Sequence, residues 1–283
     1  MRIGFVTRLL WDRYGRFWLR LLEAAGAEVS LPDPERVSAL SADRRLDAVS
    51  GRAFREATAQ ALALSGVDRL VVPELNPGYE GSRGSAQDPF VADFPGALAQ
   101  VVPGLPPLVG VPADLAAPDL ESRAVGLLTA VAPSPGTVRR VWQTHRADAK
   151  PPRPAGLPGA GGESRTLALV GQPWHLSEAL RVRLERGGER LLSAHQLAPA
   201  ELRAEGWRAD PELAPTDAEA LGAVRRFARR GDVAALRMPV DEDAGADAWL
   251  ARKARAWSRR EIEIVPLEPD AAPAPAVDGG RGS

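Results

Sequence analysis

Short apolar runs and longer amphipathic segments alternate along the first half of the chain. Each run is rich in Val, Leu or Ile and ends in proline or a polar turn, which is typical of a buried strand. In the longer segments apolar residues recur every three or four positions, which is typical of a helix with one buried face. The expected strands are residues 2–7, 27–32, 68–73 and 107–112, and the expected helices are residues 13–25, 52–64, 121–130 and 136–147.

The same alternation resumes in the second half. Strands are expected at residues 166–173, 189–194, 232–239 and 261–269, and helices at residues 176–186, 217–230 and 246–257. Apolar strands that alternate with helices predict parallel sheets covered on both faces. We therefore predict an α/β fold with two doubly wound parallel-sheet domains, flavodoxin-like or Rossmann-like, that face each other across a cleft.

A proline- and glycine-rich stretch separates the two halves. Residues 150–164 read KPPRPAGLPGAGGES, a composition typical of a linker. The predicted domains are therefore residues 1–149 and 165–269. Residues 270–283 carry too few apolar side chains to offset the entropy of ordering, so we expect a disordered tail.

The overall charge limits the expected partners. The 283 residues carry a formal net charge of -1, so no global field would attract nucleic acid or an anionic membrane. No run approaches the roughly 18 apolar residues that a membrane span requires, and the opening segment lacks a secretory cleavage site. A cytoplasmic protein that binds neither nucleic acid nor membrane is expected.

The chain contains no cysteine. This excludes disulfides, thiolate nucleophiles, thiolate zinc sites and cysteine-ligated iron–sulfur clusters built from its own residues. The phosphate-binding loop G-x-x-x-x-G-K-[ST] and the nucleophile elbow G-x-S-x-G are also missing from the sequence. We expect no cofactor and no bound metal.

The stretch from Thr7 to Asp12 follows the first expected strand. In open α/β sheets ligands bind in the crevice beyond the carboxyl ends of the strands, so Arg8 and Asp12 are candidate ligand-binding residues. Asp12 is also a plausible N-cap for the helix that follows, and Gly26 is a plausible stop for it. The aromatic residues inside this helix are expected to be core.

Three stretches carry a resemblance to a known family. They are IGFVTRLLWDRYGRFWLRLLEAAGAEVSLP at residues 3–32, VDRLVVPEL at 67–75 and VGQPWHLSEALRVRLERGGERLLS at 170–193. The chain thereby resembles the 2-hydroxyacyl-CoA dehydratase subunit-like domain of the CoA-enzyme-activase-related family. The matching positions in the first stretch are Gly4, Arg8, Tyr14, Phe17, Trp18, Gly26, Glu28 and Val29.

The departures from this family concern its iron–sulfur ligands. Asp88 stands where the family has a cysteine of the kind that holds a cluster, and RMPVDEDAG at residues 237–245 stands where a second cysteine is usual. The resemblance implies relatives that deliver an electron to a hydroxyacyl-CoA thioester through such a cluster. This chain cannot do so with its own residues.

Further candidates follow other strands. Gln172, Trp174 and His175 come directly after the first strand of the second half, where a ring could stack on a ligand and an imidazole could transfer a proton. For Trp174, packing at the interdomain contact is the favoured explanation. Asp241 opens an acidic cluster that is read either as a metal site or as the first turn of a helix. His195 is expected to be a surface residue.

A long glycine-rich loop at residues 76–89 follows the third strand and approaches the same crevice. It either closes over a ligand or is what remains of a lost cofactor site. The full set of ligand-binding candidates is Arg8, Asp12, Glu74, Asn76, Asp88, Gln172, Trp174, His175 and Asp241. No catalytic residue is identified.

Two functions of different classes remain open. The first is a cofactor-free relative of dehydratase subunits that binds a ligand or serves as a scaffold, with a dehydratase- or activase-type protein as its partner. The second is an enzyme that acts on a small acyl-CoA or nucleotide-like molecule with carboxylate, arginine and histidine residues in the cleft. Convergence of Arg8, Trp174 and Asp241 on one open cleft would favour ligand binding, whereas a cleft filled by Phe90 and Phe94 would favour a scaffold.

Overall fold

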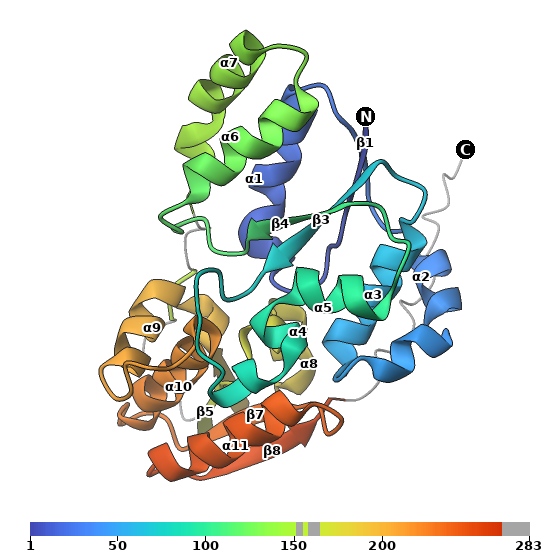
Figure 1. Cartoon of the computed structure of the whole chain (residues 1–283). Coiled ribbons are helices and arrows are strands. Elements are labelled where there is room, and N and C mark those ends of the chain that lie inside the picture. Colours follow the sequence, from blue (N-terminus) through green and yellow to red (C-terminus); the bar gives the residue numbers. More distant parts are fainter. Residues whose placement is uncertain (151–154, 158–164, 268–283) are drawn as a thin grey trace, which may run out of the picture.

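Two parallel sheets organise the protein (Figure 1). The structure is a computed structural model that describes residues 1–150, 155–157 and 165–267. Each sheet has four strands, in the orders β2-β1-β3-β4 and β6-β5-β7-β8, and every neighbouring pair is parallel. The predicted α/β fold with two doubly wound parallel sheets is confirmed. Most of the predicted linker at residues 150–164 and all of the predicted tail at residues 270–283 lie outside the described residues.

The N-terminal sheet has helices on both faces. Its strands are β1 (Arg2–Phe5), β2 (Glu28–Ser30), β3 (Arg69–Glu74) and β4 (Leu108–Pro112). Helices α1 (Trp11–Ala24), α6 (Leu120–Val131) and α7 (Pro135–His145) pack together on one side. The other side carries α2 (Pro34–Leu40), α3 (Arg52–Ala63), α4 (Pro89–Ala92) and α5 (Phe94–Val101).

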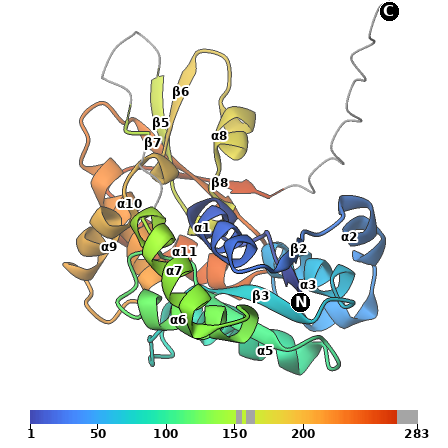
Figure 2. The ribbon, with the colours of Figure 1, turned by 90° about the horizontal axis from the view of Figure 1, so that it is seen from above.

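The C-terminal sheet repeats the strand order of the first. Its strands are β5 (Arg165–Leu169), β6 (Glu189–Ser193), β7 (Ala235–Val240) and β8 (Ile262–Pro266). Its helices are α8 (Glu178–Leu184), α9 (Pro199–Trp207), α10 (Pro215–Ala228) and α11 (Gly245–Trp257). Helices α10 and α11 contact β7, whereas α8 contacts β6 and lies apart from them when the molecule is viewed from above (Figure 2). None of the described helices is long and apolar enough to span a bilayer.

The start of α1 differs from the prediction. The helix begins at Trp11, after Leu9 and Leu10, which adopt left-handed φ angles of 63° and 70°. Leu10 occupies the N-cap position and makes no side-chain cap, so the predicted Asp12 cap is wrong and Asp12 lies in the first turn. An acidic side chain is still favourable there because it faces the positive end of the helix dipole. Gly26, at φ 93°, confirms the predicted stop.

Each domain has its own apolar core, and the core of the N-terminal domain extends into the C-terminal domain. Trp18, Leu21 and Leu22 of α1 are completely buried, which confirms that this helix face is core. The N-terminal core also includes Trp174 and Ala246 from the C-terminal domain. Apolar packing therefore continues across the domain boundary.

Helices α9 and α10 cross so closely that glycine is required at the crossing. A Cβ atom on Gly222 would overlap the carbonyl oxygen of Leu202, and a Cβ on Gly206 would overlap the carbonyl of Ala218. Both contacts are with backbone, which cannot rotate away as a flexible side chain could. The crossing fixes α9 against α10, and both helices supply charged residues to the domain interface.

We expect Gly222→Ala to lower the free energy of unfolding by about 1–3 kcal/mol, because the added methyl group must push the two helices apart. Gly126 on α6 provides a matched control, since a Cβ there meets no atom within 4 Å. Gly126→Ala should raise stability by about 0.5–1 kcal/mol through helix propensity. Urea denaturation of both variants measures the difference, and equal effects would contradict the proposed close crossing.

Candidate ligand-binding site between the two domains

A pocket of about 400 Å³ lies between the two domains. Its walls come from the segments after β1 (residues 7–13), β4 (113–115), β5 (173–178) and β6 (195–199), together with Ala155. These segments follow the carboxyl ends of strands in both sheets, the position where open α/β folds bind ligands. We call this cavity the interdomain pocket. Among the candidates predicted from the sequence, Arg8, Asp12 and Trp174 line it.

Ion pairs join the domains beside the pocket. The Arg13 guanidinium of α1 donates two hydrogen bonds, of 3.0 and 2.6 Å, to the Glu219 carboxylate of α10. Arg203 of α9 pairs with Asp114, which follows β4, and lies 3.7 Å from Glu219. Arg13, Arg203 and Glu219 are mostly buried, so water weakens these interactions less than it would weaken exposed pairs. The network holds α1 and the β4 loop against α9 and α10.

The loop from β1 to α1 is fixed from the opposite side. The Gln60 side-chain oxygen accepts hydrogen bonds from the backbone N–H groups of Thr7 and Arg8, at 2.8 and 3.0 Å. The Arg8 Nε lies 2.6 Å from a carboxylate oxygen of Glu56. Arg8 therefore lines the pocket, but its positive charge is already paired with the Glu56 carboxylate, which does not line the pocket. The start of α1, which has no side-chain cap, also lines the interdomain pocket.

Trp174 is a packing residue as well as a pocket residue. Only 8% of its surface is exposed, and its ring packs edge-on against Phe54 at a centroid distance of 5.5 Å. Phe54 also contacts Phe90 and Phe94, each at 5.9 Å. Aromatic rings thus fill one part of the domain interface, while the pocket remains open on the other side of Trp174. The binding criterion is met only in part, since Arg8 and Trp174 line one open pocket and Asp241 does not. The scaffold criterion is also met in part, since Phe90 and Phe94 pack with Phe54 beside Trp174.

Two other candidates cap helices across the interface. The Asn76 side-chain oxygen accepts a 3.0 Å hydrogen bond from the backbone N–H of Thr216, at the start of α10. Asp241 accepts from the backbone N–H of Arg52, at the start of α3. The local N-cap residues, Ala214 and Gly51, provide no side-chain cap. Each domain therefore caps a helix of the other, and neither Asn76 nor Asp241 lines the interdomain pocket.

The glycine-rich loop at residues 76–89 docks onto the C-terminal domain. The Tyr79 hydroxyl donates a 3.0 Å hydrogen bond to the backbone carbonyl of Glu212, and Arg83 pairs with the Glu212 side chain. The Ser85 backbone N–H donates to Asp217 at 3.0 Å, and the Ser85 hydroxyl also bonds to this carboxylate. The loop is thus part of the domain contact, and its residues do not line the pocket.

The four remaining candidates do not line the pocket, and each has a different setting. His175 contacts Asp247 at 2.9 Å with both side chains buried, and the same Asp247 oxygen accepts from the backbone N–H of Asp241. Glu74 pairs with Arg123 at 2.9 Å, and burial raises the pKa of its carboxyl.

Asp88 and Gln172 are also engaged elsewhere. Asp88 caps α4 by accepting from the backbone N–H of Phe90 at 2.9 Å, and burial raises the pKa of Asp88. Gln172 is completely buried beside Asp217. The acidic stretch that begins at Asp241 supplies Asp243 to an ion pair with Arg55 at 2.8 Å. Among the described residues there is no cluster of three or more acidic or histidine side chains that could hold a metal.

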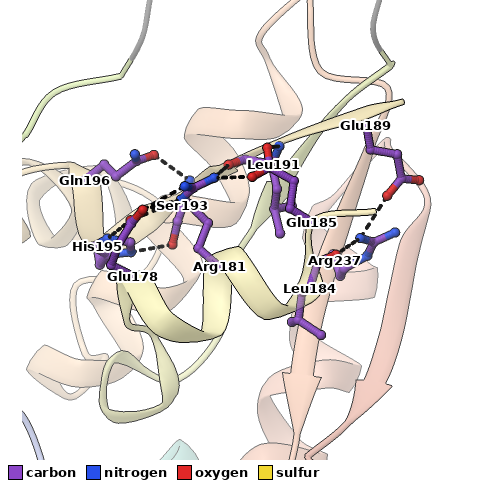
Figure 3. A network of polar contacts seen from close by, with 10 residues as sticks. All are labelled: Glu178, Arg181, Leu184, Glu185, Glu189, Leu191, Ser193, His195, Gln196 and Arg237. Carbon is purple, nitrogen blue, oxygen red and sulfur yellow. Dashed lines mark hydrogen bonds and ion pairs between the residues drawn. The ribbon is translucent and has the colours of Figure 1, made fainter. Parts of the chain in front are cut away.

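Sequence reasoning overlooked a histidine in the pocket wall (Figure 3). His195 Nδ1 lies 2.7 Å from the buried Ser193 hydroxyl, and Nε2 lies 3.1 Å from a carboxylate oxygen of Glu178. Burial lowers the pKa of His195, so the neutral imidazole is favoured at neutral pH. His195 was expected to be a surface residue; its side chain is 23% exposed, but it has a serine and a carboxylate partner that the sequence did not reveal. Glu178 lies 17 residues away on α8, so no local motif joined the two.

Comparisons with known proteins add no identification. The chain matches no family model, no curated protein and no solved structure. The resemblance to dehydratase subunits therefore stays a prediction from the sequence.

The buried Asp217 carboxyl should give the domain contact a pH dependence of unusual sign. Burial raises its pKa from 3.8 to about 6, and hydrogen bonds from Ser85 and the Gln172 side chain oppose this rise. Between these two values the folded protein binds a proton that the unfolded chain releases, so this group adds stability as the pH falls from about 7 to 4. Relative to Asp217→Asn, the wild type should gain on the order of 2 kcal/mol between pH 7.5 and 4.5.

Urea denaturation of both proteins at the two pH values measures this difference. Other carboxyl groups titrate in the same way in the wild type and the variant, so subtraction isolates Asp217. If the wild type and Asp217→Asn differ in free energy of unfolding by the same amount at both pH values, Asp217 is not desolvated at the interface.

Proposed function

We propose that this protein binds a small molecule in the interdomain pocket, and that its two α/β domains act as a fixed scaffold for that pocket. The observation that carries the proposal is the position of the cavity at the carboxyl ends of strands from both sheets. A volume of about 400 Å³ lies in the range of pockets that enclose small ligands.

The chemistry of the walls favours an apolar or aromatic ligand body. The apolar residues that line the pocket include Trp11, Trp174, Leu115, Leu176 and Leu197. Several of the charged groups in the wall have a counter-ion outside it, as Arg13 has Glu219 and Asp114 has Arg203. A ligand therefore meets few uncompensated charges. An acyl chain or a nucleobase, the ligand classes expected from the sequence, fits this surface.

The absence of cysteine separates this proposal from the redox role of dehydratase relatives. Binding in the pocket requires no metal-held thiolate, and the loop that carries Asp88 in place of the family cysteine packs against the C-terminal domain. A partner protein of the dehydratase or activase type remains part of the proposal, as the source of any cluster chemistry. The aromatic contact around Trp174 supports the scaffold component.

A second candidate function is an enzyme that transfers a proton within the pocket. His195 and Glu178 both line the cavity, and the neutral imidazole can exchange a proton with a bound group through Nε2 when Glu178 moves aside. Glu178 is 58% exposed at its side chain, which leaves it room to move. His195 replaces His175 in this hypothesis, because His175 is buried against Asp247.

Thermal-shift screening with acyl-CoAs, nucleotides and small aromatic or aliphatic carboxylates tests the binding function. A ligand at 100 times its dissociation constant should add about 2.7 kcal/mol of stability and raise the melting temperature by several degrees. Ala155→Trp should abolish this shift, because the exposed Ala155 lines the pocket and a bulky ring there fills its mouth.

Ala99→Trp is the matched control, since Ala99 is exposed on α5 and outside the pocket. Its shift should equal that of the wild type. No shift with any ligand class, or an equal loss in both variants, would contradict the proposed function.

A further inference from the structure

A second cavity of about 480 Å³ adjoins the interdomain pocket along the surface of α1. The two cavities share the lining residues Trp11, Asp12, Arg13 and Leu115, so we treat them as the two ends of one groove. One end is the largely apolar interdomain pocket. The other end, which we call the α1 groove, is lined by Arg16, Phe17 and Arg20 of α1 and by Asp148 and Lys150 before the predicted linker.

The α1 groove carries positive charges that form no ion pair with the described residues. Arg13, Arg16 and Arg20 follow one stripe of the helix, and Arg13 is already paired with Glu219. Within the part of the chain that the structure describes, no hydrogen bond or ion pair engages the side chains of Arg16, Arg20 or Lys150. Two arginines at i and i+4 on one helix repel each other, so their proximity is unfavourable unless an anion lies between them.

Two carboxylates also line this end of the groove. Asp12 is exposed in the first turn of α1, and Asp148 lies 3.5 Å from the Nδ1 of His145. Arg16, Arg20 and Lys150 therefore share this end with two carboxylates, and Arg16 and Arg20 lie about one and two helical turns beyond Asp12. Positive charge increases along the groove from the interdomain pocket toward Lys150.

We propose that the α1 groove binds the phosphate groups of a ligand whose aromatic or apolar part occupies the interdomain pocket. This inference rests on the proposed function, because it assigns the chemical class of the ligand of that pocket. Guanidinium groups bind phosphate oxygens with paired hydrogen bonds, and Lys150 adds a mobile point charge. Arg16 and Arg20 are about 6 Å apart along the helix axis, a spacing that suits a diphosphate better than a single carboxylate.

The competing explanation is that Arg16 and Arg20 are ordinary solvent-exposed residues of α1, because arginine is abundant in this chain. Arg139 and Arg140 on α7 represent that case: both are exposed, and neither lines the groove. What distinguishes Arg16 and Arg20 is that they line a cavity that adjoins the interdomain pocket and shares four lining residues with it. The two arginine pairs therefore allow a matched comparison.

Isothermal titration calorimetry with ADP, adenosine and pyrophosphate tests the inference on the full chain. The wild type should bind ADP at least tenfold more tightly than adenosine, and its ADP affinity should fall as salt is added. The double variant Arg16→Ala/Arg20→Ala should lose at least tenfold in affinity for ADP and keep its affinity for adenosine. The double variant Arg139→Ala/Arg140→Ala should bind ADP as the wild type does.

Circular dichroism of the variants confirms that these exposed substitutions leave the fold intact. Equal binding of ADP and adenosine, or unchanged ADP affinity in the α1 double variant, would overturn the phosphate site. If Ala155→Trp still abolishes ligand binding in that case, the proposed function stands without the phosphate assignment. The inference would also be overturned if pyrophosphate bound equally well to the wild type and to both double variants. It would likewise be overturned if none of the three probes bound.

Discussion

Hydrogen bonding at helix starts determines how the two domains fit together. The first N–H groups of a helix have no partner inside the helix, and a missing N-cap costs about 1 kcal/mol. The N-cap residues of α3 and α10 are Gly51 and Ala214, which cannot cap the helices with a side chain. Asp241 and Asn76 supply the caps from the opposite domain. Each domain therefore satisfies polar groups of the other, and one relative orientation is favoured.

The loops after the first and third strands have the same roles in both sheets, whereas the other two pocket walls follow the non-equivalent strands β4 and β6. The segments after β1 and β5, the first strands of each sheet along the chain, line the interdomain pocket. The segments after β3 and β7, the third strands, carry Asn76 and Asp241 and hold the domains together. Since the strand orders are the same, this division gives the interface an approximate symmetry. The pocket stays open beside a contact that is packed with aromatic rings and ion pairs.

The regular elements were predictable because their patterns are local. All eight strands and the longer helices lie where apolar periodicity places them. Helices α2, α4, α5 and α9 were missed because they are short, although each has a proline in its first turn. The start of α1 could not be inferred, since leucine gives no signal for the left-handed backbone at Leu9 and Leu10.

The site was predictable only in part, because its contacts join distant residues. Arg8, Asp12 and Trp174 were placed near the cleft by their positions after strands, and they line the pocket. The same reasoning selected Asn76 and Asp241, whose partners are 140 and 189 residues away in the sequence. A residue at the end of a strand is equally suited to bind a ligand or to cap a helix of another domain. Only the docking of the two domains separates these roles.

Differential scanning calorimetry of Asn76→Ala/Asp241→Ala tests the central claim most directly. The wild type should unfold in one cooperative transition, and the double variant in two, because the domains lose the caps that couple them. Asp33→Ala removes a comparable cap within one domain, where Asp33 accepts from the N–H of Glu35, and should leave a single transition. A single transition in the double variant, no lower in temperature than that of Asp33→Ala, would contradict the account.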